Sequence, residues 1–201
     1  DLPKKVQVAV CAKARSEPQE SPAKYYLEKL VQGSKVYIFG GGHVAQEAVP
    51  TLARVNFDCI VLEDREDFAK PELFPGARRT RLVDMEHLEE VCRDITSDDY
   101  ICVMTRGHQH DFLVEKQILR TPASYIGVIG SRKKKEAVFA KLRQEGYTDQ
   151  DLARIKTPMG LDIQAETPAE IAVSIAAEMI MERARRNHIE RPNEGGKEPC
   201  V

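Results

Sequence analysis

The chain has 201 residues, of which 42% are hydrophobic and 31% are charged, and its formal net charge at pH 7 is −2. This composition is typical of a globular protein with one sizeable core, and it provides no basic excess that would attract nucleic acid or an anionic membrane surface. The sequence contains neither a signal-peptide pattern nor an apolar run near the roughly 18 residues that span a membrane. We therefore expect a cytoplasmic protein that binds neither nucleic acid nor membrane.

A glycine-rich turn between two apolar runs is the strongest pattern in the first third of the chain. Gly40, Gly42 and Ala45 match the G-x-G-x-x-G/A pattern, in which the glycines allow a tight turn and let a phosphate approach the backbone. Asp64 follows the second apolar run, near the spacing at which a carboxylate binds ribose hydroxyls. Together these features predict a Rossmann-type βαβ unit.

The chain continues with short apolar runs that alternate with helical patterns, and this alternation predicts parallel strands joined by right-handed crossovers. The predicted strands span residues 36–39, 59–62, 79–83, 100–104 and 125–129. The predicted helices start at residue 43, span residues 86–92, 111–120, 132–144 and 148–155, and end with a long helix from residue 167. We expect an α/β fold, a Rossmann-like doubly wound parallel sheet with strand order 3-2-1-4-5 and a short N-terminal appendage.

The ends of the chain do not follow this pattern. Residues 1–32 combine one possible strand with a polar, proline-containing stretch, and we expect a segment that remains from a lost or truncated domain. Residues 33–190 should form the Rossmann-type domain. The polar residues 191–201 should form a disordered tail.

In the expected strand order, the first and fourth strands are neighbours whose connections leave in opposite directions, so a crevice opens above their carboxyl ends. Three loops should meet there, at residues 40–45, 105–111 and 130–135. The third loop offers Ser131 as a helix cap, unpaired helix N–H groups and four successive cations, a combination that favours a bound anion. The alternative for these cations is that some of them only point to solvent.

The second loop contains two histidines that are one residue apart and precede an aspartate. This H-x-H pattern supplies too few ligands for zinc, and no other His or Cys cluster completes it, so we predict no metal site. We interpret His108 as a hydrogen-bonding or proton-transfer group at the crevice and His110 as a residue of the first helical turn. The predicted cofactor-binding residues are Gly40, Gly41, Gly42, His43, Val44, Asp64, Arg65, Thr105, Arg106, His108, Gly130, Ser131 and Arg132.

The five cysteines are widely spaced and never form a C-x-x-C pair. This odd number and spacing argue against a disulfide framework or a cysteine zinc site. Cys59 and Cys102 fall inside predicted strands, where a thiol behaves as a small hydrophobic group. We expect both of them in the core.

Several unusual motifs occur in one order: IFGGGHVA, LEDR, MTRGHQHD, YIGVIGSRKK and PMGLDIQAETPAEIAVSIAAEMI. With them, residues 25–186 resemble the C-terminal Rossmann domain of the xanthine dehydrogenase accessory factor family, XdhC/CoxI. The resemblance implies an accessory factor that binds molybdenum cofactor (molybdopterin), protects it during sulfuration with a cysteine desulfurase, and delivers it to a molybdenum hydroxylase such as xanthine dehydrogenase. The family's N-terminal domain is expected to be missing or reduced to residues 1–32.

Three functions are compatible with these residues. The leading hypothesis is a non-catalytic accessory protein whose crevice holds molybdopterin or a dinucleotide such as NAD(P). The first alternative is an NAD(P)-dependent oxidoreductase with His108 as acid or base, against which we count the lack of an evident substrate domain. The second alternative is a regulatory module that senses nucleotides and catalyses nothing. In each case we expect a homo-oligomer, because the last helix carries an apolar stripe.

Overall fold

The computed structural model describes residues 34–189, except for the side chains of His108, Gln109, Arg132 and residues 187–189. The predicted N-terminal segment, 1–32, and the predicted tail, 191–201, lie outside this part of the chain. Among the described residues, no helix is both long and apolar enough to cross a membrane.

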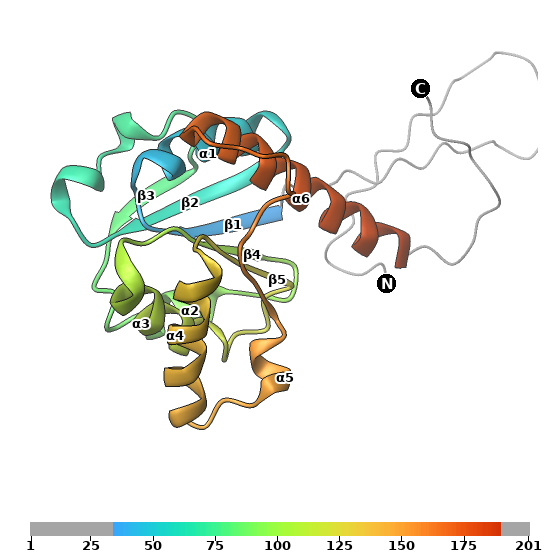
Figure 1. Ribbon diagram of the computed structural model, residues 1–201. Helices are drawn as coiled ribbons and strands as arrows, with labels where there is room; N and C mark the ends of the chain where they lie inside the picture. Colours follow the sequence, from blue (N-terminus) through green and yellow to red (C-terminus); the bar gives the residue numbers. More distant parts are fainter. Residues whose placement is uncertain (1–33, 190–201) are drawn as a thin grey trace, which may run out of the picture. The chain divides into compact units, whose positions relative to one another are not determined.

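Six parallel strands form one sheet in the order β3-β2-β1-β4-β5-β6 (Figure 1). Their bounds are β1 (Ser34–Phe39), β2 (Phe57–Glu63), β3 (Arg79–Leu82), β4 (Tyr100–Val103), β5 (Tyr125–Val128) and β6 (Ile155–Lys156). The predicted fold class and the order 3-2-1-4-5 are confirmed. The structure adds β6, which begins at the last residue of the predicted helix 148–155. The sequence does not predict this strand, because two residues are too few to give a strand pattern.

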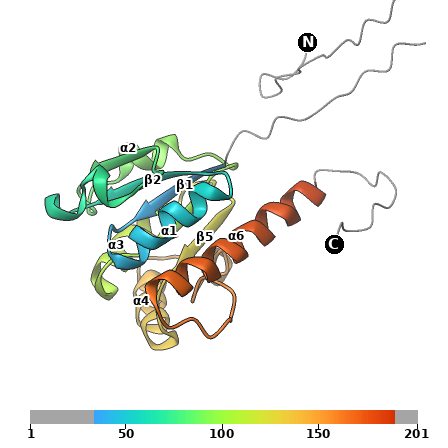
Figure 2. The same ribbon diagram turned by 90° about the horizontal axis from the view of Figure 1, so that it is seen from above.

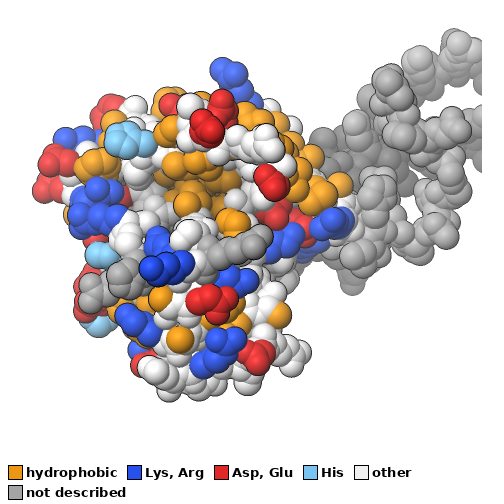
Figure 3. All heavy atoms as spheres, in the orientation of Figure 1, with side chains coloured by type: hydrophobic (Ala, Val, Ile, Leu, Met, Phe, Trp, Pro, Cys, Tyr) orange, Lys and Arg blue, Asp and Glu red, His pale blue; other side chains and the backbone are white. Residues whose placement is uncertain are grey.

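Helices cover both faces of the sheet, with α1 and α6 on one face and α2, α3 and α4 on the other (Figures 1 and 2). Their bounds are α1 (His43–Arg54), α2 (Glu89–Asp94), α3 (Gly107–Ile118), α4 (Arg132–Gln144), α5 (Asp149–Leu152) and α6 (Pro168–Ile189). Two short 3₁₀ turns, η1 (Glu66–Phe68) and η2 (Pro71–Leu73), lie in the connection from β2 to β3. On the face shown in Figure 3, Lys and Arg side chains are interspersed with Asp and Glu side chains.

Most residues of the central strands are apolar because both faces of the sheet are covered. Along β1, Val36 and Ile38 pack into the core under α1 and α6, whereas Tyr37 and Phe39 pack into the core under the other helices. Side chains of a strand alternate between its faces, so a strand buried on both sides reads as a continuous hydrophobic run. Cys59 is buried, as is Cys102, which confirms that these two thiols belong to the core.

Helix boundaries follow the capping signals where these are strong. Glu170 accepts a hydrogen bond at 2.9 Å from the backbone N–H of Thr167 and returns one from its own N–H to the threonine hydroxyl at 3.3 Å, so a capping box starts α6. By contrast, α3 begins at Gly107, four residues before its predicted start at Asp111. Glycine and histidine are weak helix formers, so the sequence pattern does not reveal this first turn.

Candidate functional site

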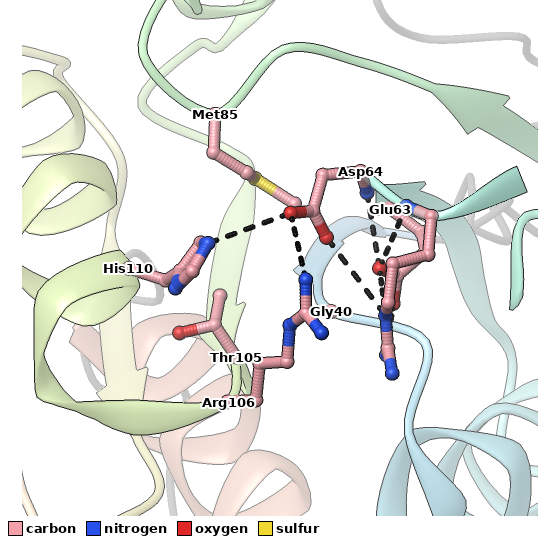
Figure 4. Close-up of a pocket in the computed structure, with 8 residues that line it drawn as sticks. Gly40, Glu63, Asp64, Met85, Thr105, Arg106 and His110 are labelled. Carbon is pink, nitrogen blue, oxygen red and sulfur yellow. Dashed lines mark hydrogen bonds and ion pairs between the residues drawn. The ribbon is translucent and has the colours of Figure 1, made fainter.

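A hollow of about 210 Å³, including its open mouth, lies at the carboxyl ends of β1, β2 and β4. We call it the first hollow. It is lined by Gly40, Glu63, Asp64, Arg65, Met85, Thr105, Arg106 and His110 (Figure 4). Strands β1 and β4 are neighbours whose connecting helices cover opposite faces of the sheet, so the hollow lies at the switch point where Rossmann-like folds bind ligands.

The innermost charge of the first hollow is the carboxylate of Glu63, the last residue of β2, which is 1% exposed. It accepts hydrogen bonds from the backbone N–H groups of Gly41 at 2.5 Å, Asp64 at 3.0 Å and Arg65 at 3.1 Å. The guanidinium of Arg65 adds two more, at 2.8 and 2.9 Å. Burial alone would raise the pKa of Glu63, but the hydrogen bonds, chiefly those from Arg65, outweigh it and lower the pKa to about 2.

The carboxylate of Asp64 lies nearer the mouth, where two basic side chains turn toward it (Figure 4). Its Oδ2 is 3.6 Å from Nη2 of Arg106 and 3.5 Å from Nε2 of His110. Burial raises the pKa of Asp64, the neighbouring Glu63 raises it further, and Arg106 opposes the rise. Both contacts are longer than the roughly 2.7–3.2 Å of a good N–H···O hydrogen bond, so each basic group forms an ion pair with Asp64 without a hydrogen bond of ordinary length.

The three consecutive glycines have different roles. A Cβ on Gly40, whose φ is 104°, would lie 2.5 Å from the backbone oxygen of Met104, and a Cβ on Gly41 would lie 2.9 Å from that of Phe68. These two glycines are therefore required by close packing of the protein itself. A Cβ on Gly42 would meet nothing within 4 Å, and no side chain caps α1, so Gly42 is where a ligand has room to approach the backbone.

Several predicted binding residues lie away from the first hollow. His43 is exposed at the start of α1, and the side chain of Val44 packs against the core under α1 and α6. Ser131 caps α4 by accepting a hydrogen bond from the backbone N–H of Lys134 at 3.4 Å. His108 and Arg132 belong to α3 and α4, but their side chains are outside the described part of the structure.

The third predicted loop lines a separate hollow, also of about 210 Å³, between α3, α4 and the end of β5. We call it the second hollow. Its lining consists of Asp111, Glu115, Val128, Ile129, Gly130, Lys134, Lys135, Val138, Phe139 and Thr157. The two hollows adjoin each other. A residue of the first, Thr105, donates a hydrogen bond from its hydroxyl to a residue of the second, Asp111.

The cations of the third loop are partly engaged within the protein. Nζ of Lys134 lies 2.5 Å from Oδ2 of Asp111, and Nζ of Lys135 lies 5.1 Å from the centre of the Phe139 ring. Lys133 is exposed. The charge of Lys134 is thus balanced by a buried carboxylate of the protein itself, an outcome that differs from both a ligand contact and exposure to solvent.

The sequence pattern assigns no role to Glu63 or Glu115, and it places His110 only as a helix residue. For Glu63 a signal exists, since a carboxylate that ends a largely apolar strand, two residues before an arginine, must be paired if the end of the strand is buried. His110 reaches Asp64 only because α3 starts early, which the sequence does not reveal. No group of three or more His, Cys, Asp or Glu side chains that could hold a metal ion occurs within the described residues.

Comparisons with known proteins show which proteins the chain is similar to. A family model described as the XdhC Rossmann domain matches residues 36–179. The chain is 30% identical over 148 residues to the Escherichia coli (strain K12) protein named uncharacterized protein YqeB, with 73% of this chain and 27% of that protein covered. It is 26% identical over 160 residues to a protein of Bacillus subtilis (strain 168) named as a probable subunit of xanthine dehydrogenase, with 80% and 46% covered.

A solved structure is also similar. The crystal structure of a xanthine dehydrogenase from Bacillus halodurans matches with a TM-score of 0.68 and 26% sequence identity, covering 80% of this chain and 45% of that one. The chain thus spans less than half the length of each of these three relatives.

Proposed function

Because the chain belongs to the XdhC Rossmann-domain family, we propose that it is a non-catalytic accessory factor in the maturation of a molybdenum hydroxylase. In this proposal it binds the molybdenum cofactor in the first hollow and passes it to a hydroxylase such as xanthine dehydrogenase. The proposed partner class is supported by the two Bacillus relatives, whose names contain xanthine dehydrogenase. A cysteine desulfurase and a second copy of the chain are further proposed partners.

The residues of the first hollow, together with Gly42, which is not part of its lining, fit a ligand with an anionic group and a polar ring. Gly42 leaves space for a phosphate to approach the uncapped N-terminus of α1. Arg106, whose side chain is 58% exposed, has its charge at the mouth and would bind the same phosphate from outside. The Asp64 carboxylate would accept hydrogen bonds from ring N–H groups or ribose hydroxyls. The molybdenum cofactor supplies both the phosphate and the N–H groups.

The observation that carries this proposal is the loose charge cluster at the switch point. A closed structural ion pair would bring Arg106 within hydrogen-bond distance of Asp64, as Arg65 is with Glu63. Instead, Arg106 and His110 surround one carboxylate at 3.5–3.6 Å beside an open hollow. This arrangement suits groups that exchange one partner for another when a ligand enters and leaves.

The proposal is tested by the pterin that remains bound to the purified protein. The protein is purified from cells that make the cofactor and from cells that do not, and released pterin is measured by fluorescence after oxidation. We expect pterin only with the first cells, and a loss of at least about fivefold in Arg106→Ala, since a charged hydrogen bond contributes about 1.5–3 kcal/mol. Arg79→Ala serves as the control, because Arg79 is an exposed arginine at the N-terminal end of β3, whereas the first hollow lies at the carboxyl ends of the strands. Equal background from both kinds of cell would contradict the proposal.

A dinucleotide such as NAD(P) is the second candidate ligand, and one observation favours it. Asp64 directly follows β2 in a βαβ unit with a glycine turn, the position at which an acid binds a ribose in dinucleotide-binding folds. Titration with NADH and NADPH, followed by fluorescence, separates the candidates. Saturable dinucleotide binding that Asp64→Asn abolishes, in a protein that retains no pterin, would favour the dinucleotide over the molybdenum cofactor.

A further inference from the structure

The second hollow contains a buried carboxyl group, one oxygen of which has no hydrogen-bond partner among the described residues. Glu115, on α3, is 2% exposed, and its Oε2 makes no hydrogen bond within the described part of the chain. Burial raises the pKa of Glu115 to about 8, with the charge of Asp111 adding to the rise and that of Lys134 opposing it. A buried polar group that is left unpaired costs about 1–3 kcal/mol. A group of this kind in the wall of a hollow is therefore available to a ligand.

The neighbouring charges leave Glu115 as the acceptor that remains free. Asp111 already accepts a hydrogen bond from the hydroxyl of Thr105 through Oδ1. Its Oδ2 forms an ion pair with the Lys134 ammonium, 2.5 Å away. The Asp111–Lys134 pair is thus electrically balanced and held by two elements, α3 and α4. A ligand that enters the hollow would meet one uncommitted carboxyl group beside a neutral ion pair.

The rest of the lining of the second hollow combines apolar side chains with the polar side chains of Lys135 and Thr157. Val128 comes from β5, and Val138 and Phe139 come from α4. A polar group beside these apolar side chains suits the edge of a planar ring, whose faces contact the hydrocarbon while its edge forms hydrogen bonds. Each hollow is shallow and opens to solvent, so each would take only one part of a ligand.

We propose that the second hollow is a subsite for the edge of a 2-aminopyrimidinone ring, the hydrogen-bonding edge shared by pterins and guanine, with Glu115 as its partner. The inference rests on the proposed function, because the anionic end of the same ligand would lie in the adjoining first hollow, where Asp64 would pair with N–H or hydroxyl groups other than those of this ring edge. A neutral Glu115 pairs with the ring N–H and the neighbouring carbonyl, whereas an ionised Glu115 pairs with the ring N–H and the amino group. The same edge of the ring is recognised in both states.

Phosphate-free probes test this subsite independently of the anion site. Binding of neopterin, guanosine and adenosine to the full chain is measured by calorimetry. We expect neopterin and guanosine to bind at least about tenfold more tightly than adenosine, which lacks this edge. Tighter binding of neopterin would identify a pterin as the source of the ring, and tighter binding of guanosine would identify a guanine nucleotide. Absence of binding by both, or equal binding of adenosine, would overturn the inference.

Variants of Glu115 then identify the group responsible. Glu115→Leu removes both oxygens, so the variant should bind neopterin and guanosine no more tightly than it binds adenosine. Glu115→Gln keeps one donor and one acceptor and should remain within about threefold of the unmodified protein. Glu136→Leu, at an exposed position of α4, is the control. Thermal unfolding monitored by circular dichroism confirms that each variant is folded. A preference that survives Glu115→Leu would overturn the inference.

The two proposals fail in distinguishable ways. If no molybdopterin copurifies but the ring preference and its dependence on Glu115 persist, the proposed function fails and the subsite stands. If molybdopterin copurifies in undiminished amount with Glu115→Leu, the subsite fails and the proposed function stands.

Discussion

The buried carboxylate of Glu63 should be the strongest electrostatic contribution to stability at this site. Glu63→Gln preserves the shape of the side chain but removes the charge to which Gly41, Asp64 and Arg65 donate their hydrogen bonds. A pKa lowered from the usual 4.5 to about 2 corresponds to about 3 kcal/mol of stabilisation. The amide group of the introduced glutamine also places its NH₂ group opposite N–H donors of the protein, so that donor faces donor. We therefore expect the substitution to lower the free energy of unfolding by about 3 kcal/mol at pH 7.

The pH dependence of this loss has a definite sign. Because the folded state lowers the pKa of Glu63, its contribution is complete above the unfolded value near 4.5 and is lost as the pH falls toward 2. The difference between the unmodified protein and the variant should thus be constant from pH 7 to pH 5 and shrink below pH 4.5.

Urea unfolding followed by circular dichroism measures these free energies at each pH. Glu66→Gln, which changes an exposed carboxylate three residues further along, is the matched control and should alter stability by less than about 0.5 kcal/mol. A loss below about 1 kcal/mol for Glu63→Gln at pH 7, or a loss that does not depend on pH, would refute the reasoning.

Further predictions concern the glycine turn, the second hollow and the core thiols. Gly41→Ala should destabilise the protein by about 2 kcal/mol or more, because its Cβ would lie 2.9 Å from a backbone oxygen, whereas Gly42→Ala should leave thermal stability unchanged and weaken retention of the ligand. Stability of the unmodified protein should fall as the pH rises from about 4.5 to 8, by up to about 5 kcal/mol, because the pKa of Glu115 is raised on folding; urea unfolding of Glu115→Gln should not show this fall. Burial raises the pKa of Cys59 to about 12 and that of Cys102 well above its usual value, so mass spectrometry should find both thiols unlabelled after brief maleimide treatment of the native protein.

The glycine turn differs from a simple phosphate-binding loop in how its backbone is used. The N–H of Gly41 already donates to Glu63, and two of the three glycines serve close packing within the protein. Only Gly42 and the helix end that follows it are left for a ligand. We therefore expect the affinity for a phosphate to depend strongly on Arg106, because the backbone alone offers few donors.

The fold follows closely from the sequence because its strands are buried on both faces. Runs such as the one from Tyr100 to Val103 are typical of interior strands of a parallel sheet, and the connections between them restrict the strand order. The two-residue strand β6 could not be predicted, since its existence depends on pairing with β5 rather than on its own pattern. Local signals thus account for the long elements and tertiary pairing for the short one.

The site is less predictable because side-chain direction is not a property of sequence spacing. The sequence predicts that Asp64 binds a ligand, and Asp64 does line the first hollow, but the pattern does not show that Glu63 is the buried anchor beside it. Likewise, the loop at Ser131 reaches the end of β5, where Gly130 lines a separate hollow. The contact of Thr105 with Asp111, which joins the two hollows, becomes visible only in three dimensions.

The most direct test of the central claim is where molybdenum lies in crystals grown from protein loaded with the cofactor, located by its anomalous scattering. Our account predicts a peak at the first hollow, with the phosphate of the cofactor beside Gly42 and Arg106. A peak elsewhere on the chain, or a first hollow filled by protein side chains in the loaded protein, would contradict it.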